Sequence, residues 1–453
     1  MDYDDMAWEI SDRIADTWVK HLFDPDTFMA IGHFLLKHHD AHDAFKFKVL
    51  QAGAFNTALH MEFLQSRSAI IRFPLPGATM FPEEKLQNEV ATIRFIGDQS
   101  PIPVPMVLHW AGKKESPLEL APFLMMEYID HHSNMINVLK TPGRPLDERV
   151  SLNPDISKTG LETLYRGMAN VIFSMSKLSK PKIGSLYQID DFTWEVARRP
   201  LSLSMNELRN DAIDSADDCR RKFVARFLLR KLVRDETLKA QWIHPESDHG
   251  PFPIWCDDFR PGNVLVDADL NITGVFDWEF TYTAPIEFTY APPLWLILEK
   301  PEYWRAGYDD WAAEYQKKLE IFLRATIDCE EEAIRKGRLA PENHRLSSAM
   351  RRSWESEDFW IMYAARDNFA FDFIFWTKID VRFFGERSDN PHICDIWRER
   401  LDLLEPAEKD FIEKHADVKL REMEAGQILA WDPDENTLEY MKSMAKVEDR
   451  SMS

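Results

Sequence analysis

The chain has 453 residues, 45% of them hydrophobic, so it can form two or three globular domains with sizeable cores. Its formal net charge of −22 argues against a nucleic-acid partner, because phosphate backbones require a basic surface. No apolar run approaches the roughly 20 residues that span a bilayer, and the acidic N-terminus is unlike a signal peptide. The four cysteines are scattered without paired spacing, which favours reduced thiols. We therefore expect a soluble, cytoplasmic protein that does not engage membranes.

Residues 1–44 are predicted to form a helical leader. Trp8, Ile14 and Trp18 recur at roughly helical spacing, and the segment around Pro25 interrupts the run. No chemistry is assigned to this segment.

From residue 45 the pattern changes to that of β-strands, predicted at 45–50, 57–63 and 68–73. A helix is expected over Pro82–Gly97, with proline near its start and acidic residues in its first turn. A proline-stiffened connection then leads to a last strand at 122–129. These elements define a small β-rich lobe over residues 45–127.

Beyond this lobe the chain is predicted to be mainly helical, giving a large lobe over residues 128–453. Helices are expected over 161–178, 305–340 and the aromatic stretch 354–376, and residues 190–250 are interpreted as charged helices. An aromatic stripe is more often core than ligand site. Its acidic residues would nevertheless suit a cationic acceptor; they are Glu357, Asp358, Asp367 and Asp372.

The segment 253–279 contains the chemistry that organises the chain. Two short apolar runs flank a turn-rich Asp-Ala-Asp-Leu-Asn sequence, which predicts a β-hairpin. Because a hairpin returns its outer ends to one place, Asp258 and Asn263 before it should lie close to Asp277 after it. Oxygen ligands from few side chains suit Mg²⁺, which keeps water and phosphate oxygens in its shell. Turn residues are often merely solvated, and that interpretation is kept for Asp267, Asp269 and Asn271.

An Asp, an Asn five residues later and a second Asp after a hairpin is how kinases build their catalytic and metal site. The sequences DFRPGN at 258–263 and FDWE at 276–279 resemble those of the aminoglycoside phosphotransferase and choline kinase family, within the protein-kinase-like superfamily. The wider context resembles its fungal phosphotransferase branch. The resemblance implies that Asp258 orients and deprotonates an acceptor hydroxyl and that Asn263 and Asp277 hold the metal. Arg260 would neutralise the transferred phosphoryl group, with a surface arginine as the alternative.

The same resemblance assigns nucleotide contacts in the small lobe. Arg72 stands where a lysine usually holds the α and β phosphates, and Glu89 stands where its helix partner is expected. Backbone N–H groups of Gly53 and Ala54 would cover the phosphates, although an ordinary hairpin is the alternative. Backbone groups of the segment 126–128, which are those of Met126, Glu127 and Tyr128, would contact the adenine edge.

Three features depart from the family pattern: Arg72 replaces lysine, Cys256 replaces histidine, and the turn at 51–56 has one glycine. They keep open a pseudokinase-like nucleotide binder or scaffold, and a metal-dependent hydrolase using the same acids is a further alternative. The favoured prediction is an α+β, two-lobed protein-kinase-like fold with a small antiparallel sheet lobe and a large helical lobe. It would transfer the γ-phosphoryl group of ATP, with Mg²⁺, to a hydroxyl of a small, possibly cationic molecule. The sequence predicts neither that molecule's identity nor the oligomeric state.

Overall fold

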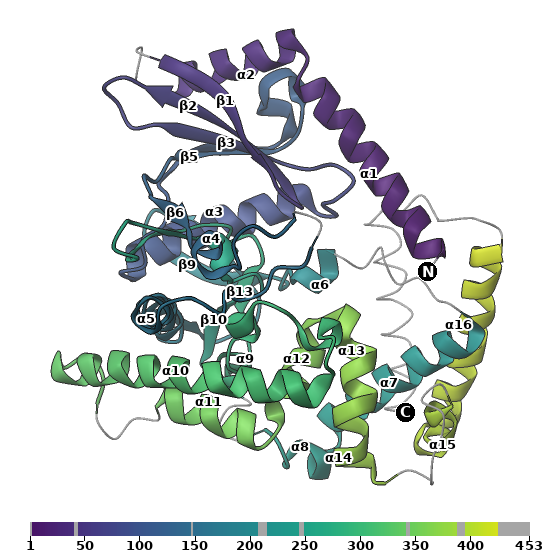
Figure 1. Cartoon of the computed structure of the whole chain (residues 1–453). Coiled ribbons are helices and arrows are strands. Elements are labelled where there is room, and N and C mark those ends of the chain that lie inside the picture. The colour runs from purple at the N-terminus through teal and green to yellow at the C-terminus, as the bar shows by residue number, and fades with distance from the viewer. Residues whose placement is uncertain are drawn as a thin grey trace.

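The computed structural model describes residues 2–39, 44–145, 148–206, 215–243, 249–340, 345–386 and 395–424. The chain begins with two helices, α1 (Asp2–Leu22) and α2 (Pro25–His38). The side chain of Asp24 caps α2 by accepting hydrogen bonds from the backbone N–H groups of Asp26 and Thr27. In Figure 1, α2 lies along the top of the molecule, next to the sheet, and α1 descends beside it.

A five-stranded antiparallel sheet follows, in the order β1-β2-β3-β5-β4. Its strands are β1 (Ala44–Ala52), β2 (Asn56–Phe63), β3 (Ala69–Pro74), β4 (Val107–Ala111) and β5 (Phe123–Glu127). Because side chains alternate across a strand, Leu59, Met61 and Ile71 pack against the N-terminal helices. Arg72 points to the opposite face, where it meets α3 (Pro82–Gln99). The small sheet lobe with one main helix is therefore confirmed.

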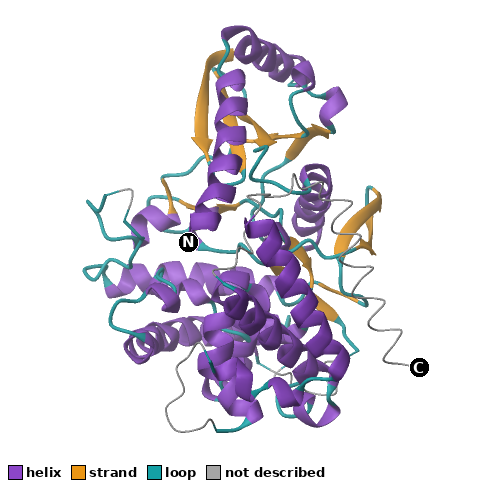
Figure 2. Ribbon diagram, turned by 90° about the vertical axis from the view of Figure 1, so that its right-hand side faces the viewer, coloured by secondary structure: helices purple, strands orange, loops and turns teal. Residues whose placement is uncertain are grey.

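Most residues that the structure describes beyond the small lobe are helical, as predicted, and form the lower part of the molecule in Figure 2. The longest helices are α5 (Lys158–Met175), α7 (Ala216–Arg234), α10 (Tyr308–Arg335) and α16 (Pro406–Glu424). The shorter ones are α4 (Met135–Leu139), α6 (Leu203–Asn206), α8 (Glu236–Lys239), α9 (Ile286–Tyr290), α11 (Leu346–Glu355), α12 (Asp358–Arg366), α13 (Asn368–Ile374), α14 (Asp380–Phe384) and α15 (Ile396–Glu399). Within the described ranges, no helix is both long and apolar enough to cross a membrane.

The aromatic stretch of the large lobe is core. Phe359 and Trp360 are buried and pack their rings against those of Trp311 and Tyr315 in α10. Three of its four candidate acids form ion pairs inside the lobe: Asp358 with Arg382, Asp372 with Arg226 and Asp367 with Lys300. These contacts hold the helices together.

One part of the secondary-structure prediction was wrong. Residues 190–250 are not helical throughout, because β8 (Ser185–Asp190) and β9 (Thr193–Arg198) form a hairpin. In β9 the side chain of Trp194 is buried, and its ring meets Phe95 of α3 edge-on at 5.6 Å. The neighbouring Thr193 and Glu195 are exposed, so the strand follows a period of two that its charged residues concealed.

The hairpin predicted at the centre of the chain is present. β11 (Val264–Val266) pairs with β12 (Ile272–Val275), with Val264 opposite Val275. The turn is held by Asp267, whose side chain accepts hydrogen bonds from the N–H groups of Asp269 and Asn271. Four further short strands surround the hairpin: β6 (Ser133–Asn134), β7 (Ser179–Lys180), β10 (Phe252–Cys256) and β13 (Thr281–Thr283).

Candidate active site

The loop that follows β10 brings Asp258 and Asn263 together. Asn263 is buried and donates its amide N–H to the Asp258 backbone carbonyl at 2.8 Å and to Asp258 Oδ2 at 3.0 Å. Arg260 Nε donates to Asp258 Oδ1 at 2.7 Å. Both carboxylate oxygens are thereby oriented, and the Asn263 amide oxygen is turned away from Asp258.

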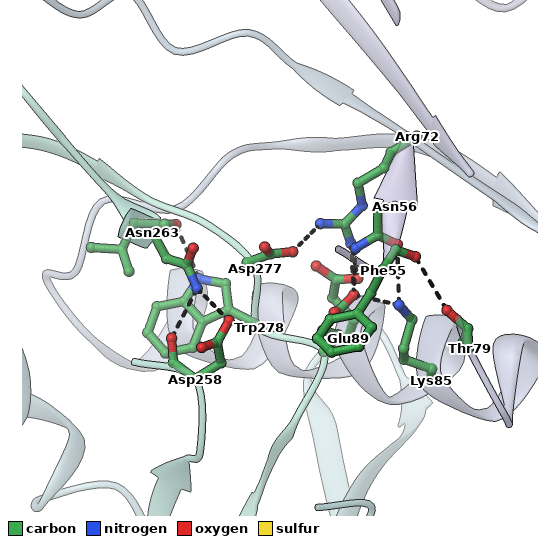
Figure 3. Close-up of polar contacts among 12 residues, drawn as sticks. Phe55, Asn56, Arg72, Thr79, Lys85, Glu89, Asp258, Asn263, Asp277 and Trp278 are labelled. Atoms are coloured by element: carbon green, nitrogen blue, oxygen red, sulfur yellow. Dashed lines mark hydrogen bonds and ion pairs between the residues drawn. The ribbon is translucent and has the colours of Figure 1, made fainter. Parts of the chain in front are cut away.

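Asp277 lies next to this pair, at the end of β12. The N–H of Phe276 donates to the backbone carbonyl of Asn263 at 3.1 Å, which ties the two loops together directly before Asp277. Asp277 adopts a left-handed backbone with φ +67°, a conformation that Asp tolerates better than most residues. Buried Trp278 anchors this turn by donating its indole N–H to the Val275 carbonyl at 3.0 Å. In Figure 3, Asp277 lies between Asn263 and Arg72.

Arg72 connects the segment at Asp277 to the small lobe. Its guanidinium forms the predicted ion pair with Glu89 of α3, and it also bonds Asp277 Oδ1, which the sequence did not indicate. Arg72 Nη2 is 3.9 Å from Glu279 Oε2. One buried cation thus bridges β3, α3 and the segment after β12 (Figure 3).

Sequence reasoning missed a second buried cation in the same network. Lys85, one helical turn before Glu89, is 1% exposed and places Nζ 2.8 Å from Glu279 Oε2. It also donates to Asn56 Oδ1 at 3.1 Å, while Asn56 Nδ2 donates to Glu279 at 2.9 Å. The spacing of Lys85 and Glu89 on one helix face could have indicated the site, but nothing local indicated Asn56.

The charges of this network do not balance. Three carboxylates, those of Glu89, Asp277 and Glu279, surround the two cations Arg72 and Lys85. Burial raises the pKa of Glu89, and burial together with the neighbouring Glu279 raises the pKa of Asp277, which Arg72 opposes. Burial alone would also raise the pKa of Glu279, but Lys85 and Arg72 hold it below its ordinary value. The surplus negative charge suits a bound cation.

The donor set beside this surplus charge fits magnesium. An amide oxygen and a carboxylate, from Asn263 and Asp277, are hard oxygen ligands of the kind Mg²⁺ takes in small number. Across the described parts of the chain, no group of three or more His, Cys, Asp or Glu side chains is arranged as a metal site. A site supplied by the protein alone is therefore not indicated, whereas one shared with a phosphate ligand is compatible with these residues.

The turn between β1 and β2 presents only part of the predicted phosphate contact. The Gly53 N–H donates to the Asn56 carbonyl at 2.8 Å, so it is used within the turn. The Ala54 N–H makes no hydrogen bond to any residue that the structure describes. Of the two predicted backbone donors, Ala54 is the one that remains open to a ligand.

Two backbone amides of the predicted adenine-contacting segment make hydrogen bonds within the protein. The N–H of Glu127 donates to the Met106 carbonyl at 2.9 Å and that of Tyr128 to the Ser68 carbonyl at 2.8 Å. Met126 lies inside β5, paired with both β3 and β4. The structure therefore does not offer the Glu127 and Tyr128 amides to a base.

Cys256 and Asp257, which directly precede Asp258, are both engaged inside the protein. Burial raises the pKa of the Cys256 thiol, which is 3% exposed, so this residue is no nucleophile. Asp257, which sequence reasoning did not single out, accepts hydrogen bonds from Leu203 N at 3.0 Å, Trp255 Nε1 at 2.7 Å and the Tyr282 hydroxyl at 3.1 Å. It fixes the backbone on which Asp258 is carried.

A cavity of about 330 Å³ borders the loop, and its lining includes no residue of the ionic network. Asp258 and Arg260 lie at its wall, and most of the remaining lining comes from the large lobe. The loop 257–263 thus contacts both the ionic network, through Asn263 and the segment at Asp277, and a separate cavity, through Asp258 and Arg260.

A scan against protein-family models matches residues 46–319 to the phosphotransferase enzyme family, more than half of the chain. Among curated proteins, the chain is 25% identical over 268 residues to the "Clavilactone A biosynthesis cluster protein Y" of Ampulloclitocybe clavipes. That alignment covers 52% of this chain and 60% of that protein, so the chain spans less than two thirds of this relative.

Solved structures with related folds include a macrolide 2'-phosphotransferase type I, at 13% identity and TM-score 0.36, covering 77% of this chain and 93% of that one. A putative fructosamine-3-kinase from Thermobifida fusca has 14% identity and TM-score 0.34, with 69% and 93% covered. At these identities and TM-scores, the similarity says nothing about the ligands or the functional residues of this chain.

Proposed function

The chain belongs to the phosphotransferase enzyme family, and we propose that it transfers the γ-phosphoryl group of ATP, with Mg²⁺, to a hydroxyl group of a small molecule. The observation that carries the proposal is the junction of Asp258, Asn263 and Asp277 beside an ionic network with surplus negative charge. Kinase-like transfer follows from the family, whereas the nucleotide, the metal and the acceptor class are the proposal.

Asp258 is assigned the role of proton acceptor. Its two carboxylate oxygens are held by Arg260 and Asn263, so the acceptor hydroxyl would meet a base of fixed orientation. As the acceptor oxygen bonds to the γ phosphorus and the bond to the ADP oxygen breaks, the hydroxyl proton passes to Asp258. Arg260 lies where it would neutralise charge on the transferred group.

Asn263 and Asp277 are the residues that would hold Mg²⁺, whose chemistry is to neutralise and align the β and γ phosphates. Arg72 is assigned to the phosphates through the Nη groups that now contact Asp277 and Glu89, and Ala54 N–H to the same end of the nucleotide. Contacts of Met126, Glu127 and Tyr128 with the base stay part of the proposal, and those of Glu127 and Tyr128 would use backbone carbonyls because their amides are engaged. The protein's contribution is therefore mainly positioning and charge neutralisation.

A nucleotide-binding scaffold is the second candidate. It is favoured by the Arg72–Asp277 contact, which engages the metal loop within the protein, and by the engaged amides of Gly53, Glu127 and Tyr128. It would bind the nucleotide without forming product.

The test is ADP formation from ATP and Mg²⁺ with a panel of hydroxyl-bearing metabolites, using the wild type and Asp258→Asn. The proposal expects acceptor-dependent ADP and a phosphorylated product, both lost in the variant. Nucleotide binding without turnover of any acceptor would favour the scaffold. Release of inorganic phosphate without any acceptor would favour a metal-dependent hydrolase.

A further inference from the structure

The cavity beside Asp258 is where an acceptor hydroxyl would enter, because Asp258 is part of its lining and no residue of the ionic network is. We propose that the acceptor, given the phosphotransferase function proposed above, is a compact and mostly apolar alcohol or phenol. It would carry a carbonyl or carboxylate oxygen toward Arg366. This class differs from the cationic acceptor that the sequence suggested.

The lining of the cavity favours an apolar occupant. Aliphatic and aromatic side chains from several elements form most of its wall, among them Ile172, Phe259, Leu294, Trp295, Leu298 and Met350. A volume of about 330 Å³ lies near the lower end of the range for small-molecule pockets, roughly 300 to 1,000 Å³. A single ring system with short substituents fits such a space better than a multi-ring sugar.

The acids that line the cavity are already paired. Asp258 is held by Arg260 and Asn263, and Asp257 accepts hydrogen bonds from the Leu203 N–H, the Trp255 indole and the Tyr282 hydroxyl. Asp367, the remaining acid of the lining, contacts Lys300 Nζ at 2.6 Å through Oδ2. Its Oδ1 caps α13 by accepting from two backbone N–H groups, at 3.1 and 3.0 Å.

The cavity is lined by three acidic and three basic side chains, and the basic ones are Arg260, Lys300 and Arg366. Each acid of this described lining has a partner within the protein. An ammonium group entering the cavity would lose hydration without gaining a free carboxylate, which is costly in a largely apolar site. This argues against amino sugars with several positive charges.

Arg366 supplies the polar feature of the cavity. Its guanidinium lies over the rings of Trp255 and Phe288, at 4.5 and 5.4 Å from their centres, and Nε donates to the Met362 carbonyl at 2.8 Å. Stacking on two rings and one backbone bond fix the plane of the group.

The remaining Nη donors of Arg366 make no hydrogen bond to any described residue. A guanidinium carries five N–H donors, so several are available to a ligand oxygen. Because hydrogen bonds to charged groups are among the stronger ones, a carbonyl or carboxylate at this position would orient the acceptor.

The experiment measures binding to the full chain saturated with Mg²⁺ and AMP-PNP. The probes are 4-(hydroxymethyl)benzoate, benzyl alcohol, choline and hygromycin B. We expect both aromatic probes to bind and the carboxylate probe to bind more tightly, by about tenfold or more. In Arg366→Met this preference should fall to near parity. In Leu294→Trp, where a half-buried wall residue is enlarged, binding of both aromatic probes should be lost.

Leu64→Trp, at an exposed loop position of the small lobe, is the matched control and should bind as the wild type does. The acceptor class is overturned if choline or hygromycin B binds more tightly than the aromatic probes, or if neither aromatic probe binds at about 10 mM. It is also overturned if aromatic binding survives Leu294→Trp. Failure of the phosphotransferase function itself looks different: the wild type would then either not bind AMP-PNP with Mg²⁺, or bind it and form no ADP from ATP with any hydroxyl-bearing acceptor.

Discussion

The loop at Asp258 contacts two regions that differ in polarity. Toward the small lobe, Arg72, Lys85 and three carboxylates form a buried network with charges at fixed positions. Toward the large lobe, the loop borders a mostly apolar cavity whose three acids each have partners within the protein. The charged network suits the nucleotide, which is the same in every turnover. The apolar cavity suits the selection of an acceptor by its shape. Damage on the ionic side should affect all acceptors, whereas damage on the cavity side should change only which acceptor is used.

The largest effect is expected at the residue that both sides share. Asp258→Asn removes the proton acceptor, so ADP formation should fall by about 10² to 10⁴-fold with every acceptor that the wild type uses. Steady-state ADP release measures it. Asp269→Asn, in the exposed hairpin turn, should keep wild-type activity. If ADP formation fell with only some acceptors, Asp258 would contribute to acceptor binding and not to proton transfer.

The ionic side should depend on Lys85 for stability. Lys85→Met leaves Glu279 buried without its nearest cation, and removing one partner of a buried ion pair costs about 3 to 5 kcal/mol. Urea unfolding followed by tryptophan fluorescence measures the free energy of unfolding. In Arg199→Met, which breaks a partly exposed pair with Glu84, we expect a cost of about 1 kcal/mol or less. Equal costs would show that the buried network is no stronger than a surface pair.

The same network should make stability depend on pH. The folded-state pKa of Glu279 lies below its ordinary value because Lys85 and Arg72 outweigh the effect of burial. Its ionised form therefore adds stability above the unfolded-state pKa, and this contribution is lost as the pH falls through the folded-state pKa. The difference in unfolding free energy between the wild type and Glu279→Gln should be largest near neutral pH and shrink in acid. A difference that grows in acid would contradict a lowered folded-state pKa for Glu279.

The smallest effect is expected on the cavity side. Leu294→Ala removes apolar contact from a half-buried wall residue, so its cost in stability should be about 1 kcal/mol. KM for the acceptor should change while KM for ATP stays constant, because the residue lies away from the ionic network. Parallel changes in both constants would contradict the separation of the two sides.

The parts of this arrangement that sequence could predict are local. The hairpin was recognisable because its β-branched runs and its Asp-rich turn are adjacent, and it determines where Asp258, Asn263 and Asp277 meet. The ion pair between Arg72 and Glu89 was predicted from the family resemblance. The register that engages the amides of Glu127 and Tyr128 is set by strand pairing, which residue types do not reveal.

The contact of Asn56 with Glu279 joins residues 223 positions apart, and no periodicity indicates such a pair. The hairpin of β8 and β9 was missed because charged residues conceal its alternation. Contacts between side chains that are far apart in the sequence, such as those lining the cavity, can be identified only from the packed structure.

The central claim is that Asp277 and Asn263 form a metal-dependent nucleotide site. The direct measurement is the thermal shift of the protein with AMP-PNP, with and without Mg²⁺, in the wild type and in Asp277→Asn. Asn tolerates the left-handed backbone at this position, so the variant removes the charge without adding strain. We predict that AMP-PNP raises the melting temperature only with Mg²⁺ and that Asp277→Asn abolishes this rise. Stabilisation that is independent of Mg²⁺, or unchanged in the variant, would contradict the account.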